Sequence, residues 1–119
     1  MTPPPLFDRS VVDDLAEVIG AAGTRSALAI FIRESRAYAA TIAQAGMRGA
    51  DAASRDRARQ AAHSLKSGAG QVGAMALAVL AAAVEVAAGD GSPDLAQVAA
   101  PLEQCVEETV AALNEFLAG

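Results

Sequence analysis

The residue with the clearest chemical potential is the single histidine, His63, which lies three positions before the single lysine, Lys66. Residues three or four apart on a helix are surface neighbours, so a helix through this segment brings the imidazole and the ammonium group together. A neutral imidazole is a nucleophile toward phosphorus, and the resulting phosphoramidate keeps a high potential for further transfer. Lys66 would offset the charge of an incoming phosphoryl group, and the hydroxyl of Ser67 would donate a hydrogen bond to its oxygens. The spacing therefore favours phosphoryl transfer at His63.

The helix that carries His63 is predicted to begin after Asp51, a good N-cap, and to run to about Gly70. On a helical wheel, His63 lies about 160° from Leu65, the centre of the apolar side, so its ring should point to solvent. The core stripe is expected at Ala58, Ala62, Leu65, Ala69 and Val72. The polar neighbours on the outer side are Asp56, Arg59, Gln60, Ser67 and Gly70.

Three glycines, at positions 68, 70 and 73, crowd the C-terminal side of this helix. A glycine inside a helix costs about 1 kcal/mol relative to alanine, so some other requirement favours low bulk here. We interpret Gly68 and Gly70 as keeping the surface low for a partner that reaches the histidine. Arg59 and Gln60, about one turn before it, are predicted to lie in the same docking surface.

Hydrophobic periodicity predicts further helices on both sides. A short first helix is expected from Ser10 to Gly20, started by a capping box of Ser10 and Asp13, and a second helix is expected after Thr24 as N-cap. The segment 74–88 is apolar nearly all round, which is typical of a centrally packed helix. A last helix should follow from residue 95, with Pro101 as a kink or as its true start.

The fold class predicted from these elements is all-α: an antiparallel four-helix bundle with a short additional N-terminal helix. The 119 residues allow one domain, and the chain is 53% hydrophobic but only 3% aromatic, so helices with small side chains at their contacts are expected. We predict a single domain over residues 1–119, in which residues 1–7 form an extended lead that contains three prolines.

Several functional classes are disfavoured by composition. The formal net charge of -5 offers no general attraction for nucleic acid or an anionic membrane. One histidine and the single Cys105 provide no metal-ligand set, so no metal or cofactor is expected on this chain. The start has no signal-peptide pattern, and the longest apolar run, 74–84, is too short to span a bilayer. A cytoplasmic location is therefore expected.

The run from Ala62 to Ala74 resembles the phosphorylation-site motif of histidine-containing phosphotransfer (HPt) domains, roughly A-H-x-L-K-G-x-[AS]-x-x-[LVI]-G-[AL]. The similarity continues into the apolar segment and Glu85, where the family often has an acid. Ser67 departs from it, because the family usually has glycine at that position. The positions in register are His63, Leu65, Lys66, Ala69, Val72, Gly73 and Ala74.

This resemblance implies a non-enzymatic phosphocarrier of a two-component phosphorelay, with an exposed histidine on a four-helix bundle. It implies phosphorylation of the outer ring nitrogen, Nε2, by the phosphoaspartate of a receiver domain that binds its own Mg²⁺. The expected partners are receiver domains of response regulators and a hybrid histidine kinase. A monomer is also expected.

Two other readings remain open from the sequence. A non-catalytic helical adaptor would have the same periodicity, with His63 incidental. A histidine-kinase dimerisation domain also presents a helical histidine, but it resembles H-E-[LI]-[RK]-[TN]-P there, whereas Ser64 replaces the acid and no proline follows nearby.

Overall fold

The computed structural model describes residues 4–47 and 51–118, and these residues form five helices and no strands. The long helix α1 spans Arg9–Met47 and is followed by α2, Ala52–Gln71, which carries His63. Next come α3, Met75–Gly89, the short α4, Leu95–Ala99, and α5, Leu102–Ala118. The all-helical fold class predicted from the sequence is therefore confirmed for the described residues.

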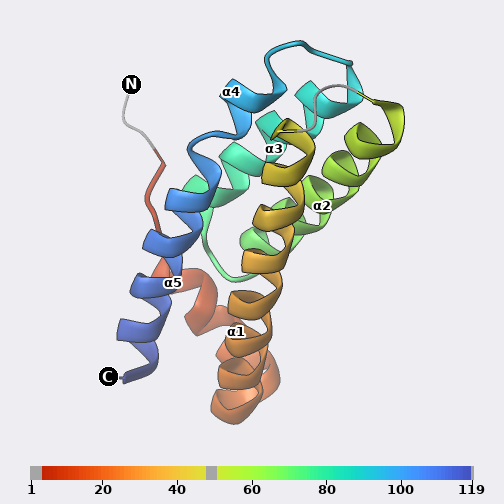
Figure 1. The fold of residues 1–119 in the computed structure, drawn as a ribbon. Helices are drawn as coiled ribbons and strands as arrows, with labels where there is room; N and C mark the ends of the chain where they lie inside the picture. Colours follow the sequence, from red (N-terminus) through yellow and green to blue (C-terminus); the bar gives the residue numbers. More distant parts are fainter. Residues whose placement is uncertain (1–3, 48–50, 119) are drawn as a thin grey trace.

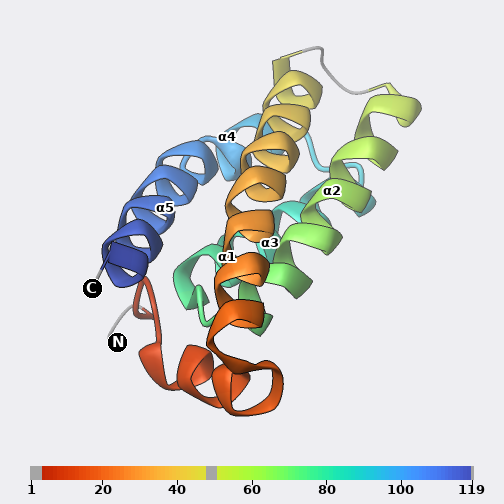
Figure 2. The same ribbon diagram turned by 90° about the horizontal axis from the view of Figure 1, so that it is seen from below.

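Helix α2 packs on α3 and α1, and α5 packs on α1 and α3, so the histidine helix and α5 lie on opposite sides of α1 (Figures 1 and 2). Small side chains allow the close approach of α2 to α3, since Ala58, Ala62 and Ala81 are fully buried. Larger residues from each long helix fill the centre of the bundle; Leu28, Ile42, Leu65, Leu77, Leu102 and Leu113 are the largest.

Helix α1 is interrupted at Gly20, where the first predicted helix was expected to end, because its φ of 81° and ψ of 170° are not helical. The predicted caps on either side of this break are wrong. Thr24 is not an N-cap, because its hydroxyl donates back to the Gly20 carbonyl oxygen at 2.8 Å. Ser10 and Asp13 do not form the expected capping box; instead Asp8 accepts hydrogen bonds from the backbone N–H and hydroxyl of Ser10.

The two ends of α2 have clear physical causes. Asp51 caps its start as predicted, accepting from the Ser54 backbone N–H at 2.7 Å, and these hydrogen bonds from Ser54 lower the pKa of the Asp51 carboxyl. Gly73 follows its end with a φ of 79°. A Cβ on Gly73 would clash with the Asp8 carbonyl oxygen, at 2.4 Å. The carbonyl oxygen of Gly73 in turn accepts a hydrogen bond from the Asp8 N–H. This glycine is therefore required by the fold, not by docking.

Two of the later predictions change in detail. Helix α3 is not buried all round, because Val79 and Val86 are exposed at 56% and 61%. Two alternatives were predicted for Pro101, a kink in the last helix or its true start, and the structure shows the second. The segment from residue 95 forms the separate helix α4, and α5 begins at Leu102, where the Cys105 N–H donates to the Pro101 carbonyl oxygen. Cys105 is buried in the core.

Helix α1 is long and apolar enough, by length and composition alone, to cross a membrane; its most apolar window has a mean hydropathy of 1.5 and is 17% buried. The core helix of a bundle passes the same test. Leu28, Phe31 and Ile42 of α1 are buried in the bundle core, and Ser35 beside them is buried as well. We interpret α1 as a core helix on the basis of this packing.

Candidate functional site

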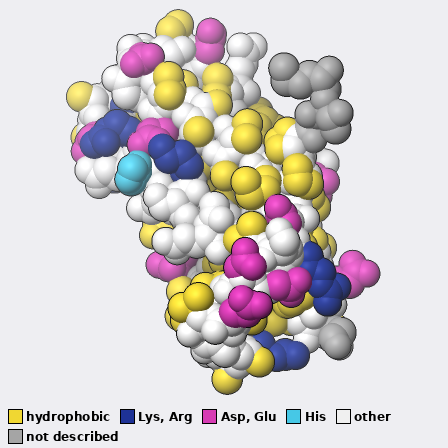
Figure 3. Space-filling model, turned by 180° about the vertical axis from the view of Figure 1, so that it is seen from behind, with side chains coloured by type: hydrophobic (Ala, Val, Ile, Leu, Met, Phe, Trp, Pro, Cys, Tyr) yellow, Lys and Arg dark blue, Asp and Glu magenta, His cyan; other side chains and the backbone are white. Residues whose placement is uncertain are grey.

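His63 lies on the outer side of α2, with 60% of its side chain exposed. The predicted core stripe is confirmed: all five of its residues, Ala58, Ala62, Leu65, Ala69 and Val72, are buried. Because these residues determine which side of α2 faces the bundle, they also determine that the imidazole faces solvent. Figure 3 shows the histidine on the surface, beside acidic and basic side chains.

A carboxylate from the neighbouring helix links the two groups predicted to do the chemistry. Oε2 of Glu85, on α3, lies 2.7 Å from Nδ1 of His63, and its Oε1 accepts from Nζ of Lys66 at 2.6 Å. We call Glu85, His63 and Lys66 the Glu85 bridge. The Lys66 hydrogen bond, and next the His63 hydrogen bond, lower the pKa of Glu85, so its side chain is an anion at neutral pH.

The Glu85 bridge orients the imidazole. An ionised carboxylate only accepts hydrogen bonds, so the neutral ring must carry its proton on Nδ1 and donate it to Glu85. The lone pair of the neutral ring then lies on Nε2, the nitrogen that Glu85 does not contact. With the ring exposed, this nitrogen is available to an electrophile brought by another molecule.

Glu85 was not among the site residues predicted from the sequence, although the motif comparison noted an acid there. It lies 22 residues from His63 and on another helix, so helical spacing does not connect them. One signal was present: Glu85 is the only charged residue in Met75–Gly89. A lone acid in an apolar helix needs a polar partner or solvent, and here it has both.

The residues one turn before His63 form a separate polar cluster. Asp56 accepts from Arg59 at 2.8 Å through one oxygen and from Gln60 at 2.8 Å through the other. Arg59 and Gln60 therefore share the outer side of α2 with the histidine, as predicted.

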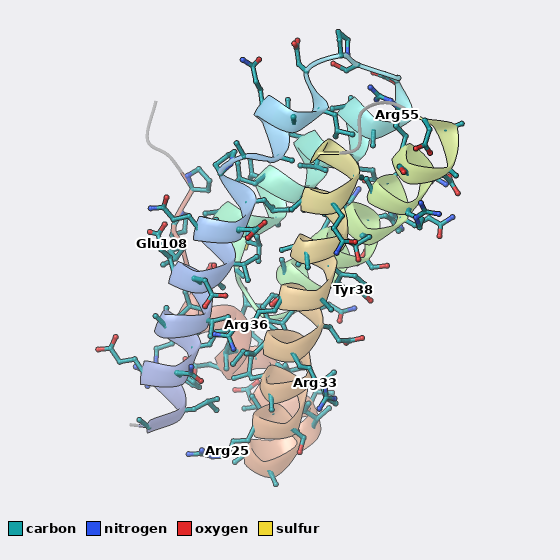
Figure 4. The ribbon with its side chains drawn as sticks, viewed as in Figure 1. Arg25, Arg33, Arg36, Tyr38, Arg55 and Glu108 are labelled. Carbon is teal, nitrogen blue, oxygen red and sulfur yellow. The ribbon has the colours of Figure 1, made fainter. Side chains whose placement is uncertain are left out.

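Arg55 has a different position from these docking candidates. Its guanidinium donates to the Ala87 carbonyl at 3.3 Å and to the Ser92 carbonyl at 2.5 Å, and Figure 4 labels it near the end of the bundle where α3 leads to α4. These bonds satisfy carbonyls at the end of α3, so Arg55 has a structural role.

The remaining predicted residues lie on the C-terminal side of His63. Ser67 and Gly70 are exposed, and a Cβ on Gly70 would meet nothing within 4 Å. Gly68 is half-buried and lines a groove of about 400 Å³ between α1 and α2, where a Cβ would lie 3.4 Å from the Phe31 ring. Packing within the bundle therefore does not explain why position 70 is a glycine, whereas Gly68 packs against the Phe31 ring.

No group of three or more histidine, cysteine or acidic side chains that could hold a metal ion occurs among the described residues. The Glu85 bridge itself contains one carboxylate, one imidazole and a cation, and a cation beside the carboxylate opposes metal binding there.

The sequence matches the family model of the Hpt domain over residues 26–117. The chain belongs to the Hpt domain family. Its fold is similar to the crystal structure of histidine-containing phosphotransfer protein B (HptB) from Pseudomonas aeruginosa PAO1, with a TM-score of 0.80 and 23% sequence identity over 93% of each chain. A search of curated proteins found no significant match.

Membership of the Hpt domain family assigns the chain to two-component phosphorelays, in which Hpt domains work with receiver domains and kinases. Proteins of this family are phosphotransfer intermediates and not classical enzymes. The family model begins at residue 26, so the matched region contains α2 with His63, α3 with Glu85 and most of α1.

Proposed function

We propose that this Hpt domain accepts a phosphoryl group on Nε2 of His63 from the phosphoaspartate of a receiver domain and returns it to another receiver. The observation that carries the proposal is the 2.7 Å contact of Nδ1 with the Glu85 carboxylate, on an exposed ring. It leaves Nε2 as the free nucleophilic nitrogen, which is the atom a docked partner can reach.

In the transfer step, the Nε2 lone pair forms a bond to phosphorus while the bond from phosphorus to the aspartate oxygen breaks. The aspartate leaves as a carboxylate, and the imidazole keeps its Nδ1 proton. The ring gains positive charge as the new bond forms, and the Glu85 carboxylate stabilises that charge. Glu85 is therefore proposed as a positioning and electrostatic residue, which the sequence-based site lacked.

Lys66 and Ser67 are proposed to act on the phosphoryl oxygens. Lys66 Nζ is held by Glu85 beside the imidazole, where its charge offsets part of the incoming negative charge. Ser67 lies four residues after His63 on the exposed side of α2, so its hydroxyl is within one turn of the ring. The receiver supplies the Mg²⁺, and this chain needs no bound cofactor.

The docking surface proposed around His63 includes Arg59 and Gln60 on one side and Gly68 and Gly70 on the other. Arg59 and Gln60 are already ordered by Asp56, so less side-chain entropy is lost on binding. The exposed Gly70 leaves room for the partner's surface close to the helix backbone.

We also infer the finer architecture from the helix order and contacts. The described residues fit one domain, an antiparallel four-helix bundle in which Arg9–Ile19, before the break at Gly20, acts as the short N-terminal helix. Residues 4–7 of the predicted lead are non-helical, and residues 1–3 lie outside the described residues. We propose that the protein works in the cytoplasm as a monomer.

The test uses two phosphoryl donors. Phosphoramidate, a small molecule that phosphorylates histidine directly, should label the wild type with an acid-labile, base-stable phosphate. Receiver domains from the same genome, phosphorylated with acetyl phosphate, should transfer their label to the wild type. H63Q should remove labelling by both donors and keep the helical circular dichroism spectrum, because His63 is exposed. Persistent label in H63Q would exclude His63. Phosphoramidate labelling without transfer from any receiver would favour an adaptor.

A further inference from the structure

The Glu85 bridge contacts the ring nitrogen that phosphorylation leaves unmodified. Oε2 of Glu85 lies 2.7 Å from Nδ1 of His63, whereas the proposed phosphoryl group bonds to Nε2, at another edge of the ring. The Glu85 side chain is only 21% exposed, and its other oxygen accepts from Lys66 at 2.6 Å, so the carboxylate is held on two sides. A phosphoryl group on Nε2 therefore leaves the contact at Nδ1 in place.

A phosphorylated imidazole has two forms, one with a proton on Nδ1 and one without it. In the first form, Nδ1 donates a hydrogen bond to Glu85. In the second form, the Nδ1 lone pair and the carboxylate oxygen are both acceptors and would face each other at 2.7 Å. The negative charge of Glu85 also favours the positively charged ring of the first form. The contact therefore opposes loss of the Nδ1 proton.

The other charged groups near His63 do not cancel this preference. Lys66 is bound by the same carboxylate, and Arg59, one turn before the histidine, is paired with Asp56. Helix α3 contains no further charged residue. On α1, the charged side chain that lines the groove against α2 is the acid Glu34, and the phosphoryl group itself adds negative charge. Both of these charges favour the protonated ring as well.

The Nδ1 proton determines how readily the phosphate leaves the ring. In the return step, an aspartate oxygen of the receiver bonds to phosphorus while the bond from phosphorus to Nε2 breaks, and its electron pair stays on Nε2. A ring that has kept its Nδ1 proton leaves as neutral imidazole. A ring without that proton would leave as an imidazolate anion, which is a much poorer leaving group. Hydrolysis follows the same rule, with water as the nucleophile and one of its protons released to solvent.

We propose that Glu85 keeps Nδ1 of the phosphorylated His63 protonated through neutral pH, so that the phosphate stays in its transferable form; this rests on the proposed function. The carboxylate that leaves Nε2 free to attack in the unphosphorylated ring then maintains the leaving-group form of the phosphorylated ring. A shorter lifetime in water follows, because hydrolysis uses the same protonated form.

The test compares the wild type with E85Q and with E107Q, which makes the same change at an exposed ion pair on α5. Each protein is labelled to completion with excess phosphoramidate, and loss of the label is followed across neutral and alkaline pH, with and without an unphosphorylated receiver. The amide in E85Q can donate to Nδ1 or accept from it, so it favours neither form. We expect the label of E85Q to become stable about one pH unit lower than that of the wild type. Its loss should then be about tenfold slower at alkaline pH, with E107Q unchanged.

The shape of the pH profile separates this proposal from other effects of the variant. Profiles that coincide in E85Q and E107Q would overturn it. A loss rate changed by the same factor at every pH would also overturn it, because that result assigns the effect to Lys66, which E85Q releases. Nitrogen NMR of the labelled proteins at alkaline pH should show Nδ1–H in the wild type and not in E85Q. A wild type that phosphoramidate fails to label would instead refute the proposed function.

Discussion

Among the residues that the structure describes, two acid–base contacts join helices, and they differ in how the carboxylate is used. On the side of α5, the guanidinium of Arg36 on α1 donates to both carboxylate oxygens of Glu107, at 2.8 and 3.0 Å. Figure 4 labels Arg36 where α1 faces α5. On the side of α2, Glu85 gives one oxygen to Lys66 and the other to His63. Each contact lowers the pKa of its carboxyl, through the hydrogen bond from the cation first.

The two contacts differ in how exposed their side chains are, and in whether a partner keeps an unused nitrogen. Arg36 and Glu107 are both more than half exposed, and the two-pronged pair uses both carboxylate oxygens on one partner. The side chain of Glu85 is only 21% exposed, and its second partner is a ring with a second, unused nitrogen. The same pairing chemistry is therefore a surface link between α1 and α5, but an orienting device between α3 and α2.

The strongest way to break this contrast is to remove the Glu85 carboxylate. E85A should lower the rate of phosphoryl transfer to His63 by about tenfold or more, because the ring loses the group that holds its proton on Nδ1 and stabilises its charge. E85Q keeps the shape and removes only the charge. Nitrogen NMR should show mixed ring tautomers in E85A but Nδ1–H in the wild type. A single Nδ1–H tautomer in E85A would contradict the orienting role.

A smaller loss is expected when the cation is removed. K66A should slow transfer a few-fold and shorten the lifetime of the phosphohistidine. The loss should be small because the Lys66 side chain is partly exposed, so water screens its attraction for the phosphoryl group and can solvate that group when the lysine is absent. K66R, which keeps the charge, should retain more of the rate. Time courses of labelled phosphate transfer from a phosphorylated receiver, quenched at set times, measure the transfer rate and the lifetime of the phosphohistidine. Wild-type rates and lifetimes in K66A would remove Lys66 from the mechanism.

Acidification should weaken the Glu85 bridge in a defined direction. The pKa of Glu85 is lower in the folded chain than in the unfolded chain, so its stabilisation is complete above the unfolded value and is lost as pH falls through the folded value. The difference in unfolding free energy between wild type and E85Q should therefore shrink below about pH 4.3, the ordinary value for glutamate. Urea unfolding at neutral and acidic pH measures it, and a difference that grows on acidification would reverse the assignment.

The smallest effect is expected at the other pair. R36A and E107A should leave transfer to His63 unchanged and change stability little, because the pair is exposed and screened by solvent. The change in unfolding free energy of the double variant should equal the sum of the changes in the two single variants, because an exposed pair contributes little coupling energy. A transfer rate that falls in R36A as it does in E85A would remove the contrast between the two contacts.

Sequence patterns predicted the parts of the fold that depend on local spacing. The stripe from Ala58 to Val72, the Asp51 cap and the start of α5 after Pro101 all follow from residues within a few turns, and all are confirmed. The errors concern individual caps and contacts between segments. Thr24 does not cap a helix but donates to the Gly20 carbonyl oxygen four residues before it. Gly73 is needed for a reason that only the tertiary structure shows, because the Asp8 backbone packs against it.

The candidate site divides in the same way. The sequence by itself determined that His63 faces solvent with Lys66 one turn away, because helical periodicity orients every side chain of α2 relative to its apolar stripe. Only the tertiary structure decided that Glu85 joins them and that Nε2 is the free nitrogen, since the carboxylate comes from another helix, 22 residues away. Its position depends on how closely the small side chains let α3 pack on α2, which no local pattern specifies.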